Sequence, residues 1–145
     1  MRAAALPQDF RRKITIASDC SGMGSDVMAM ERVLPSGWEC LFASDQSKFC
    51  RKVLSRHMKK GSGQGKLFRN MISKKRKAFS CQDLDIYTTG PPCQPYSSEG
   101  VGRGASDPRC LLTAAAAHIE SLRPKIFVIE NVAGLLRKRH KAWAQ

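Results

Sequence analysis

The chain has little of the apolar sequence that membrane-spanning and secreted proteins require. None of its apolar runs approaches the roughly 20 residues that cross a bilayer. Residues 1–13 also lack the apolar core of a secretory signal. These absences argue against both classes of protein. They predict a soluble intracellular protein. We expect its location to be the nucleus if the source is eukaryotic and the cytoplasm otherwise.

The sequence also lacks the spacings of a disulfide framework or a metal site. No two of its six cysteines form a close pair, and its three histidines show no metal-ligand spacing. We therefore expect no bound metal, and we expect most thiols to be buried as small apolar groups. The residues concerned are Cys20, Cys40, Cys50, Cys81, Cys93, Cys110, His57, His118 and His140.

Acidic residues are missing from one long stretch. Residues 51–77 contain eleven Lys or Arg and no Asp or Glu, within a chain of net charge +13, and a second basic cluster occupies residues 137–141. Such clusters bind nucleic-acid phosphates without reading sequence. A basic run is also typical of a solvated helix face or a localisation signal. Both interpretations of residues 51–77 stay open.

The apolar periodicity predicts strands that alternate with helices. This order is typical of an α/β fold with a doubly wound, mostly parallel sheet. We expect one partial catalytic domain over residues 13–136, between basic tails at 1–12 and 137–145. The last helix should be capped by Ser106 or Asp107 and end before Pro124. The expected strands are 13–18, 39–44, 67–72, 85–89 and 125–130, and the expected helices are 25–34, 47–59 and 107–122.

Two segments place a thiol and a carboxylate at one edge of that sheet. Cys93 follows a Pro-Pro pair after the fourth strand, and Glu130 closes the apolar run 126–129, which is typical of a buried strand. A thiolate that adds to carbon 6 of cytosine makes carbon 5 nucleophilic, if an acid of raised pKa also protonates N3. We interpret Cys93 as the nucleophile and Glu130 as the acid. The alternatives are an inert thiol and a salt-bridged strand end.

A glycine loop follows the first strand. Gly22 and Gly24 lack side chains, so the backbone there can approach a ligand closely. Asp45 stands after the second strand, where such folds place an acid that accepts hydrogen bonds from ribose hydroxyls. A lone aspartate in this position is also typical of a turn or a helix cap.

These segments together resemble the C5-cytosine-specific DNA methyltransferase family. The resemblance rests on four motifs in order, at residues 18–25, 91–94, 107–112 and 130–132. It implies a Rossmann-like fold, S-adenosylmethionine as cofactor, DNA as partner and methyl transfer through a covalent Cys93 adduct. It also implies cofactor contacts at Cys20, Ser21, Gly22, Gly24, Asp45, Asn70 and Pro92, and substrate contacts at Gln94, Ser97 and Asn131.

The chain departs from the family pattern at several positions. Cys20 replaces the usual phenylalanine, and Asp45 replaces the usual glutamate. The acidic residue near the adenine has no clear counterpart; Asn70 is the best match by position, and Asp83 is its rival. Arg109 is either a charge on a helix face or a phosphate contact, and Asn131 either shapes its turn or touches substrate.

Two expectations concern larger segments. The glycine-containing loop 97–106 resembles one that closes over a flipped base, although it is equally typical of a plain connection. The family's catalytic domain continues beyond the fifth strand with elements that bind the cytosine and complete the cofactor pocket. We therefore expect an amino-terminal fragment whose fifth strand leaves an apolar edge uncovered.

Three functions follow from this interpretation. The first is DNA cytosine-5 methylation. The second is methylation of a transfer RNA, which one branch of the family carries out with the same Cys and Glu-Asn-Val motifs. The third is an inactive remnant that binds nucleic acid through its basic stretches.

Overall fold

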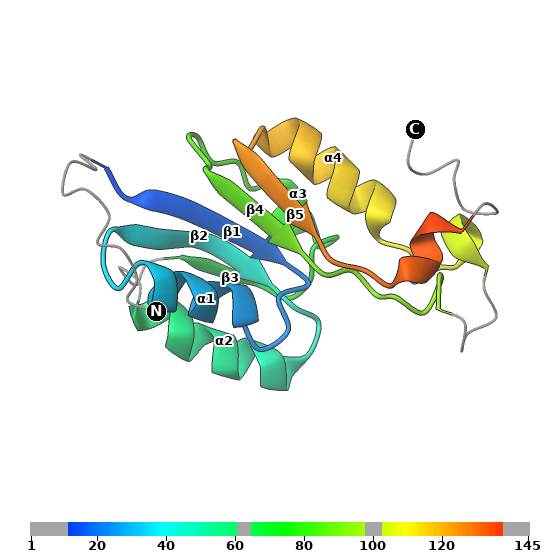
Figure 1. Ribbon diagram of the computed structural model, residues 1–145, viewed down its shortest axis with the longest axis horizontal. Helices are drawn as coiled ribbons and strands as arrows, with labels where there is room; N and C mark the ends of the chain where they lie inside the picture. Colours follow the sequence, from blue (N-terminus) through cyan, green and yellow to red (C-terminus); the bar gives the residue numbers. More distant parts are fainter. Residues whose placement is uncertain (1–11, 61–64, 98–102, 138–145) are drawn as a thin grey trace.

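The computed structural model describes residues 12–60, 65–97 and 103–137. They form a five-stranded sheet in the order β3-β2-β1-β4-β5, in which every neighbouring pair is parallel. Helices lie on both faces of this sheet (Figure 1). The strands are β1 (Ile14–Asp19), β2 (Trp38–Ser44), β3 (Lys66–Phe68), β4 (Ile86–Thr89) and β5 (Ile126–Ile129), and the helices are α1 (Ser25–Val33), α2 (Lys48–Lys60), α3 (Lys74–Lys77) and α4 (Leu112–Leu122), with short 3-10 turns η1 (Gly104–Ser106) and η2 (Ala133–Leu136). The doubly wound parallel sheet predicted from the sequence is confirmed.

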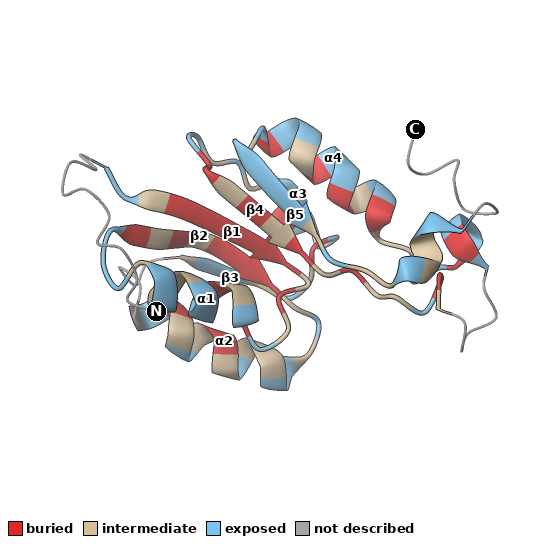
Figure 2. Ribbon diagram, viewed as in Figure 1, coloured by how far each residue is buried: buried red, intermediate tan, exposed pale blue. Residues whose placement is uncertain are grey.

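Alternating residues of the inner strands supply a core on each face of the sheet. On one face Ile16 and Cys40 pack with Val27 of α1 and Leu54 of α2. On the other face Ala17 and Phe42 pack with Leu122 of α4. Neighbouring residues of one strand point to opposite faces, so β1 and β2 are apolar on both and are buried along most of their length (Figure 2).

Strand β5 forms one edge of the sheet and is not buried, contrary to the expectation for residues 126–129. Ile126, Phe127 and Val128 are 59%, 54% and 52% exposed. The apolar run predicts the strand correctly, but periodicity does not show whether a neighbour covers it. Among the described residues, β5 pairs only with β4, so its other edge is open. The apolar edge expected from the sequence is therefore present.

Two element boundaries expected from the sequence are wrong. Strand β3 covers only Lys66–Phe68, because the chain turns after Phe68 and then forms α3, which the apolar pattern does not predict. Helix α4 begins at Leu112 rather than near residue 107, and Leu111 occupies its N-cap position. Asp107 instead uses its carboxylate to bind the backbone and side chain of Arg109. Most of both expected tails, residues 1–11 and 138–145, lies outside the described part of the chain.

Candidate active site

The glycine loop joins β1 to α1 at the carboxyl end of the sheet. Cys20, Gly22 and Gly24 all have positive φ, at 53°, 55° and 88°, so the backbone reverses within five residues. A Cβ atom added at Gly24 would lie 2.6 Å from Leu54 Cδ1, whereas one at Gly22 would meet nothing within 4 Å. Gly24 is thus required by packing against α2. Gly22 leaves open space beside the backbone, as expected for a loop that approaches a ligand.

Serine side chains and backbone groups hold this loop against β2. Ser21 N donates to Ser44 O at 2.9 Å, and Ser21 Oγ donates to the same carbonyl at 3.2 Å.

Burial, together with the charges of Asp19 and Asp45, raises the pKa of Cys20 to about 12. The Cys20 thiol is therefore neutral at physiological pH and unsuited to nucleophilic attack.

A cleft of about 610 Å³ opens at this end of the sheet. This volume is within the range of small-molecule sites, about 300–1,000 Å³. The cleft gathers residues from the glycine loop, the ends of β2, β3 and β4, and the segment before α4. Six predicted site residues line it: Cys20, Gly22, Asp45, Asn70, Pro92 and Gln94. Ser21 and Gly24 are buried and do not line the cleft.

Asp45 shapes the turn before α2, one of the roles that the sequence left open, while its contact with a ribose stays a prediction. Its Oδ1 accepts a hydrogen bond from Ser47 N at 2.8 Å, just before α2 begins, and its Oδ2 accepts one from Gly22 N at 2.9 Å. Asp45 therefore ties the glycine loop to the start of α2. Each carboxylate oxygen has two lone pairs, so each retains acceptor capacity towards the cleft.

Asn70 and Asp83 occupy opposite ends of the sheet. Asn70 lines the cleft, and its Oδ1 is buried without a hydrogen-bond partner among the described residues. Asp83 is exposed, and its carbonyl accepts a hydrogen bond from Thr15 at the start of β1. Asp83 therefore lies away from the cleft that Asn70 lines, and a contact between Asn70 and the adenine stays a prediction.

The Cys93 turn is held by neighbours on several sides. Cys93 O accepts hydrogen bonds from Tyr96 N and Ser97 N, both at 2.9 Å. Tyr96 is buried, and its hydroxyl lies 3.3 Å from Cys110 Sγ. A Cβ atom added at Gly134 would lie 2.0 Å from Tyr96 O, so η2 packs directly on the turn. Cys93 itself is half-buried, between the cleft residues Pro92 and Gln94.

The Glu-Asn-Val segment is fastened to the same turn. Asn131 Nδ2 donates to Pro91 O at 3.1 Å, while Asn131 Oδ1 accepts from Val132 N at 2.9 Å. Asn131 therefore shapes the turn, one of its two expected roles. Glu130 Oε2 lies 3.3 Å from the position a Cβ atom would take at Gly90, which lines the cleft. The predicted nucleophile and acid thus stand on adjoining segments.

Glu130 is exposed, which corrects the expectation of a buried carboxyl group. The cause is the open edge at β5, since Glu130 directly follows that strand. Four of the predicted site residues do not line the cleft in the described part of the chain, although they stand on segments beside it. They are Cys93, Ser97, Glu130 and Asn131. Residues 98–102 of the loop expected to close over a base lie outside the described part of the chain.

Arg109 lies before α4, so it is not a charge on a helix face. Its Nε and Nη2 donate to Asp107 at 2.9 and 2.7 Å, and its side chain lines the cleft. These hydrogen bonds hold the pKa of Asp107 at about 2. The guanidinium is fixed at the rim of the cleft, where a phosphate contact stays a prediction.

A buried ionic network beneath the cleft was not predicted from the sequence. Arg76 of α3 is 1% exposed, and its Nε and Nη2 donate to the buried Asp19 Oδ2 at 3.0 and 2.7 Å. The guanidinium also lies 3.9 Å from the ring centre of Phe42. Tyr87 Oη donates to Asp19 Oδ2 at 2.9 Å, and His118 Nδ1 lies 3.1 Å from that oxygen. The network joins β1, β2, β4, α3 and α4.

The electrostatics of this network favour an ionised Asp19. Burial by itself would raise the Asp19 pKa, but hydrogen bonds from His118 and Arg76 and the charge of Arg76 lower it below its ordinary value. Burial and the Asp19 charge raise the pKa of Tyr87, which stays a neutral donor. Arg76 is one of four consecutive basic residues. No local sequence signal separates it from its exposed neighbours.

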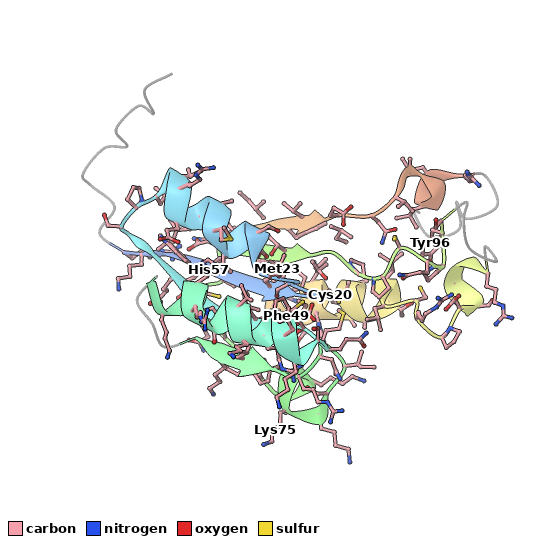
Figure 3. All side chains as sticks on the ribbon, turned by 90° about the horizontal axis from the view of Figure 1, so that it is seen from below. Cys20, Met23, Phe49, His57, Lys75 and Tyr96 are labelled. Carbon is pink, nitrogen blue, oxygen red and sulfur yellow. The ribbon has the colours of Figure 1, made fainter. Side chains whose placement is uncertain are left out.

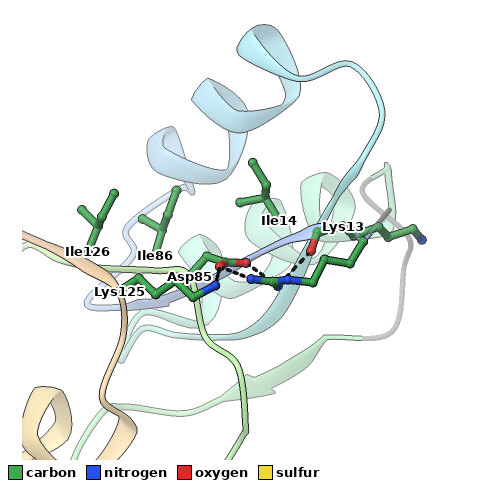
Figure 4. A pocket seen from close by; sticks show the side chains of 7 residues that line it. Lys13, Ile14, Asp85, Ile86, Lys125 and Ile126 are labelled. Atoms are coloured by element: carbon green, nitrogen blue, oxygen red, sulfur yellow. Dashed lines mark hydrogen bonds and ion pairs between the residues drawn. The ribbon is translucent and has the colours of Figure 1, made fainter. Parts of the chain in front are cut away.

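A second hollow, of about 290 Å³, lies at the amino ends of β1, β4 and β5 (Figure 4). It contains none of the predicted site residues. Arg12 Nη2 and Lys125 Nζ lie 2.5 and 2.9 Å from Asp85 Oδ1. Although burial would raise the Asp85 pKa, hydrogen bonds from Arg12, Thr15 and Lys125 lower it below its ordinary value. This cluster fastens the strand ends opposite the cleft.

Two further features are absent from the described ranges. None of the helices there is long and apolar enough to cross a membrane. In the same ranges, His, Cys, Asp and Glu do not assemble into a group of three or more that could hold a metal ion.

Comparison with known proteins decides the family. The family described as C-5 cytosine-specific DNA methylase matches residues 14–145. The chain belongs to this family. It is 31% identical over 124 residues to the Type II methyltransferase M.FnuDI of Fusobacterium nucleatum. The aligned segment covers 83% of this chain and 33% of M.FnuDI. It is 40% identical over 65 residues to M.NgoPII of Neisseria gonorrhoeae, covering 44% of this chain and 19% of that protein.

Solved structures support the fold of this C-5 cytosine methylase chain. The methyltransferase EhMeth of Entamoeba histolytica superposes with a TM-score of 0.58 at 17% identity, over 92% of this chain and 43% of EhMeth. A DNMT2 mutant of Spodoptera frugiperda gives 0.57 at 18% identity, over 91% of this chain and 40% of that protein. The chain spans about a third of M.FnuDI and less than half of either structural neighbour.

Proposed function

We propose that this chain supplies the catalytic Cys and Glu and part of the cofactor site of a DNA cytosine-5 methyltransferase. The observation that carries the proposal is the attachment of the Glu130 segment to the Cys93 turn through the Asn131–Pro91 hydrogen bond, beside a cleft lined by the glycine loop. Family membership supports DNA as the substrate, as do the names of the Type II methyltransferases that this chain resembles.

The cleft has features that suit S-adenosylmethionine. Gly22 leaves room beside the loop backbone, Asp45 keeps acceptor capacity for ribose hydroxyls, and Asn70 Oδ1 has no hydrogen-bond partner among the described residues. An unpaired buried acceptor costs about 1–3 kcal/mol, which a donor on a ligand would recover. Bound there, S-adenosylmethionine would supply an electrophilic methyl group.

The chemical role of the chain begins with Cys93. Its thiolate attacks carbon 6 of cytosine, and the electron pair of the 5,6 double bond moves through the ring towards N3. Glu130 donates a proton to N3, so no negative charge builds up on the ring. Carbon 5 is then an enamine carbon that can accept a methyl group. Loss of the carbon 5 proton to a base, departure of the Cys93 thiolate and return of the N3 proton to Glu130 restore the neutral aromatic ring.

The exposure of Glu130 bears on this role. We infer that a bound cytosine would cover the Glu130 side chain and exclude water from it during catalysis.

Methyl transfer by a chimera separates the enzymatic hypotheses from the inactive remnant. The chain would replace the aligned region of M.FnuDI, and the chimera would be given radiolabelled S-adenosylmethionine with either nucleic acid. We expect 5-methylcytosine in DNA. Label in transfer RNA alone would assign the chain to the RNA-modifying branch. A folded chimera that binds cofactor and DNA but transfers no methyl group would support the inactive remnant.

A further inference from the structure

One edge of the sheet carries a concentration of exposed positive charge. Helix α2 has four exposed cationic side chains on one stripe, at spacings of four, four and three residues: Lys48, Lys52, Arg56 and Lys59. Side chains at these spacings stack along one face of a helix. With a rise of about 1.5 Å per residue, the stripe is roughly 16 Å long.

Strand β3 and helix α3 extend the charge around that edge. Five further cations are exposed there: Lys66, Arg69, Lys74, Lys75 and Lys77. The labelled Lys75 projects outward from α3, away from the sheet (Figure 3). We call these nine residues, which come from α2, β3 and α3 and include Arg69 directly after β3, the β3-edge basic surface. No acidic residue occurs anywhere between positions 46 and 82, so this segment supplies no carboxylate to neutralise it.

The structure separates most of these nine cations from others that serve the fold, although Lys66 Nζ also lies 4.7 Å from the centre of the Phe79 ring. Arg51 Nη1 donates to the carbonyls of Asp45 and Gln46 at 2.7 and 2.8 Å, which fastens the start of α2. Arg76 forms a buried ion pair with Asp19. The described remainder of the basic stretch is exposed to solvent.

Protection of an open edge explains only part of this surface. Lysines on an edge strand prevent pairing with other chains, and Lys66 on β3 suits that purpose. The stripe on α2 faces away from the strand ladder, and α3 is not a strand. Neither contributes to blocking the β3 edge.

We propose that the β3-edge basic surface is a second contact for duplex DNA, which binds the phosphate backbone outside the segments that carry Cys93 and Glu130. This inference rests on the proposed function, because DNA is the polyanion on which those segments would act. Charge complementarity carries it, since nine exposed cations meet no carboxylate from the segment that supplies them. The surface begins at the rim of the cleft. Ser47, Asn70 and Ile72 line the cleft, and each stands one or two residues from a member of the surface: Lys48, Arg69 and Lys74.

The dimensions of the surface match a DNA backbone. One strand of duplex DNA carries a charge every 3.4 Å of helix axis, so the stripe on α2 is long enough to face about five phosphates. Contacts of this kind position the duplex without reading its sequence. The surface would therefore add affinity and leave target choice to other elements.

The test measures binding of the full chain to a labelled DNA duplex by fluorescence anisotropy between about 50 and 200 mM salt. One variant carries Lys52→Gln, Arg56→Gln and Lys59→Gln. A second carries Lys74→Gln, Lys75→Gln and Lys77→Gln. A matched control removes three exposed charges outside the surface by Lys13→Gln, Arg32→Gln and Arg123→Gln. Circular dichroism melts confirm that all four proteins are folded.

We expect each surface variant to lower the salt slope by about 2.7, since each phosphate contact contributes about 0.9, and to weaken binding on the order of 10²-fold near 0.1 M salt. The control should change binding much less. Equal loss in the control and the surface variants would overturn the inference, because net charge alone would then explain binding.

Two further outcomes separate this inference from the proposed function. A parent chain that binds duplex RNA or anionic phospholipid vesicles more tightly than DNA would overturn the assignment of the partner. Unchanged DNA binding in both surface variants would overturn the proposed role of the β3-edge basic surface. It would leave the proposed function standing, because methyl transfer by the M.FnuDI chimera is measured separately.

Discussion

Replacing Arg76 with methionine should destabilise the domain strongly, although Arg76 stands in a run of surface lysines. The change removes the guanidinium that donates to Asp19 but leaves a side chain that still packs on Phe42. Asp19 would then be a buried carboxylate without its cationic partner. Met71 and Ile72, which line the cleft, belong to the segment that Arg76 anchors. We therefore expect weaker cofactor binding as well.

The magnitude follows from the burial of both partners, which are 1% and 0% exposed. Breaking a buried ion pair by removing one partner costs about 3–5 kcal/mol, whereas domains unfold with only about 5–15 kcal/mol. For a urea slope of about 2 kcal/mol per molar, the loss shifts the unfolding midpoint by roughly 2 M. Lys75→Met is the matched control. It removes an exposed charge from the same helix and should change stability by at most about 0.5 kcal/mol.

Urea unfolding followed by circular dichroism measures these free energies for Arg76→Met, Asp19→Asn and the double variant. Because the two residues interact directly, the double variant should lose at least about 1 kcal/mol less than the sum of the single losses. A loss below about 1 kcal/mol for Arg76→Met, or strict additivity in the cycle, would show that the pair does not stabilise the fold.

Three other predictions concern the loop, acid stability and the acid residue. Gly24→Ala should destabilise the chain by about 1–3 kcal/mol, because the residue has φ of 88° and its Cβ would meet Leu54 at 2.6 Å; an unchanged melting temperature would contradict this. Asp19 and Asp107 have lowered pKa values, about 2 for Asp107, so their stabilisation is complete above about pH 4 and is lost as pH falls through the native values. Urea unfolding at pH 7, 4 and 3 should show this fall in the free energy of unfolding, and the fall should be smaller in Asp107→Asn. A free energy of unfolding that stays constant over this pH range would contradict the prediction. Glu130→Gln in the M.FnuDI chimera should slow methyl transfer about 10²-fold or more and leave DNA affinity nearly unchanged; full turnover would make Glu130 structural.

The sequence predicts the inner strands and the main motifs well because local patterns determine them. The runs that become β1, β2 and β4 are short, apolar and bounded by turn residues, and helices α1 and α2 match their expected ranges within one residue at either end. Gly22, Asp45 and Asn70 meet at one cleft because each follows a parallel strand, and parallel strands end at the same edge.

The remaining features depend on contacts that local sequence does not contain. The Asp19–Arg76 pair joins residues 57 positions apart, and Arg76 is indistinguishable in sequence from Lys75 or Lys77. The exposure of β5 and Glu130 depends on what lies beside the strand rather than on its composition. Asp107 has the residue type and position of a helix cap, but its carboxylate binds Arg109 and the helix begins later.

Covalent trapping at Cys93 tests the central claim most directly. DNA that contains 5-fluorocytosine would be incubated with the M.FnuDI chimera and S-adenosylmethionine, because fluorine cannot leave carbon 5 as the proton does and the adduct persists. Mass spectrometry of the digested complex should place the nucleotide on Cys93, and Cys93→Ser should abolish the adduct while DNA binding remains. An adduct that survives Cys93→Ser, or that maps to another residue such as Cys20, would contradict the assignment of Cys93 as the nucleophile.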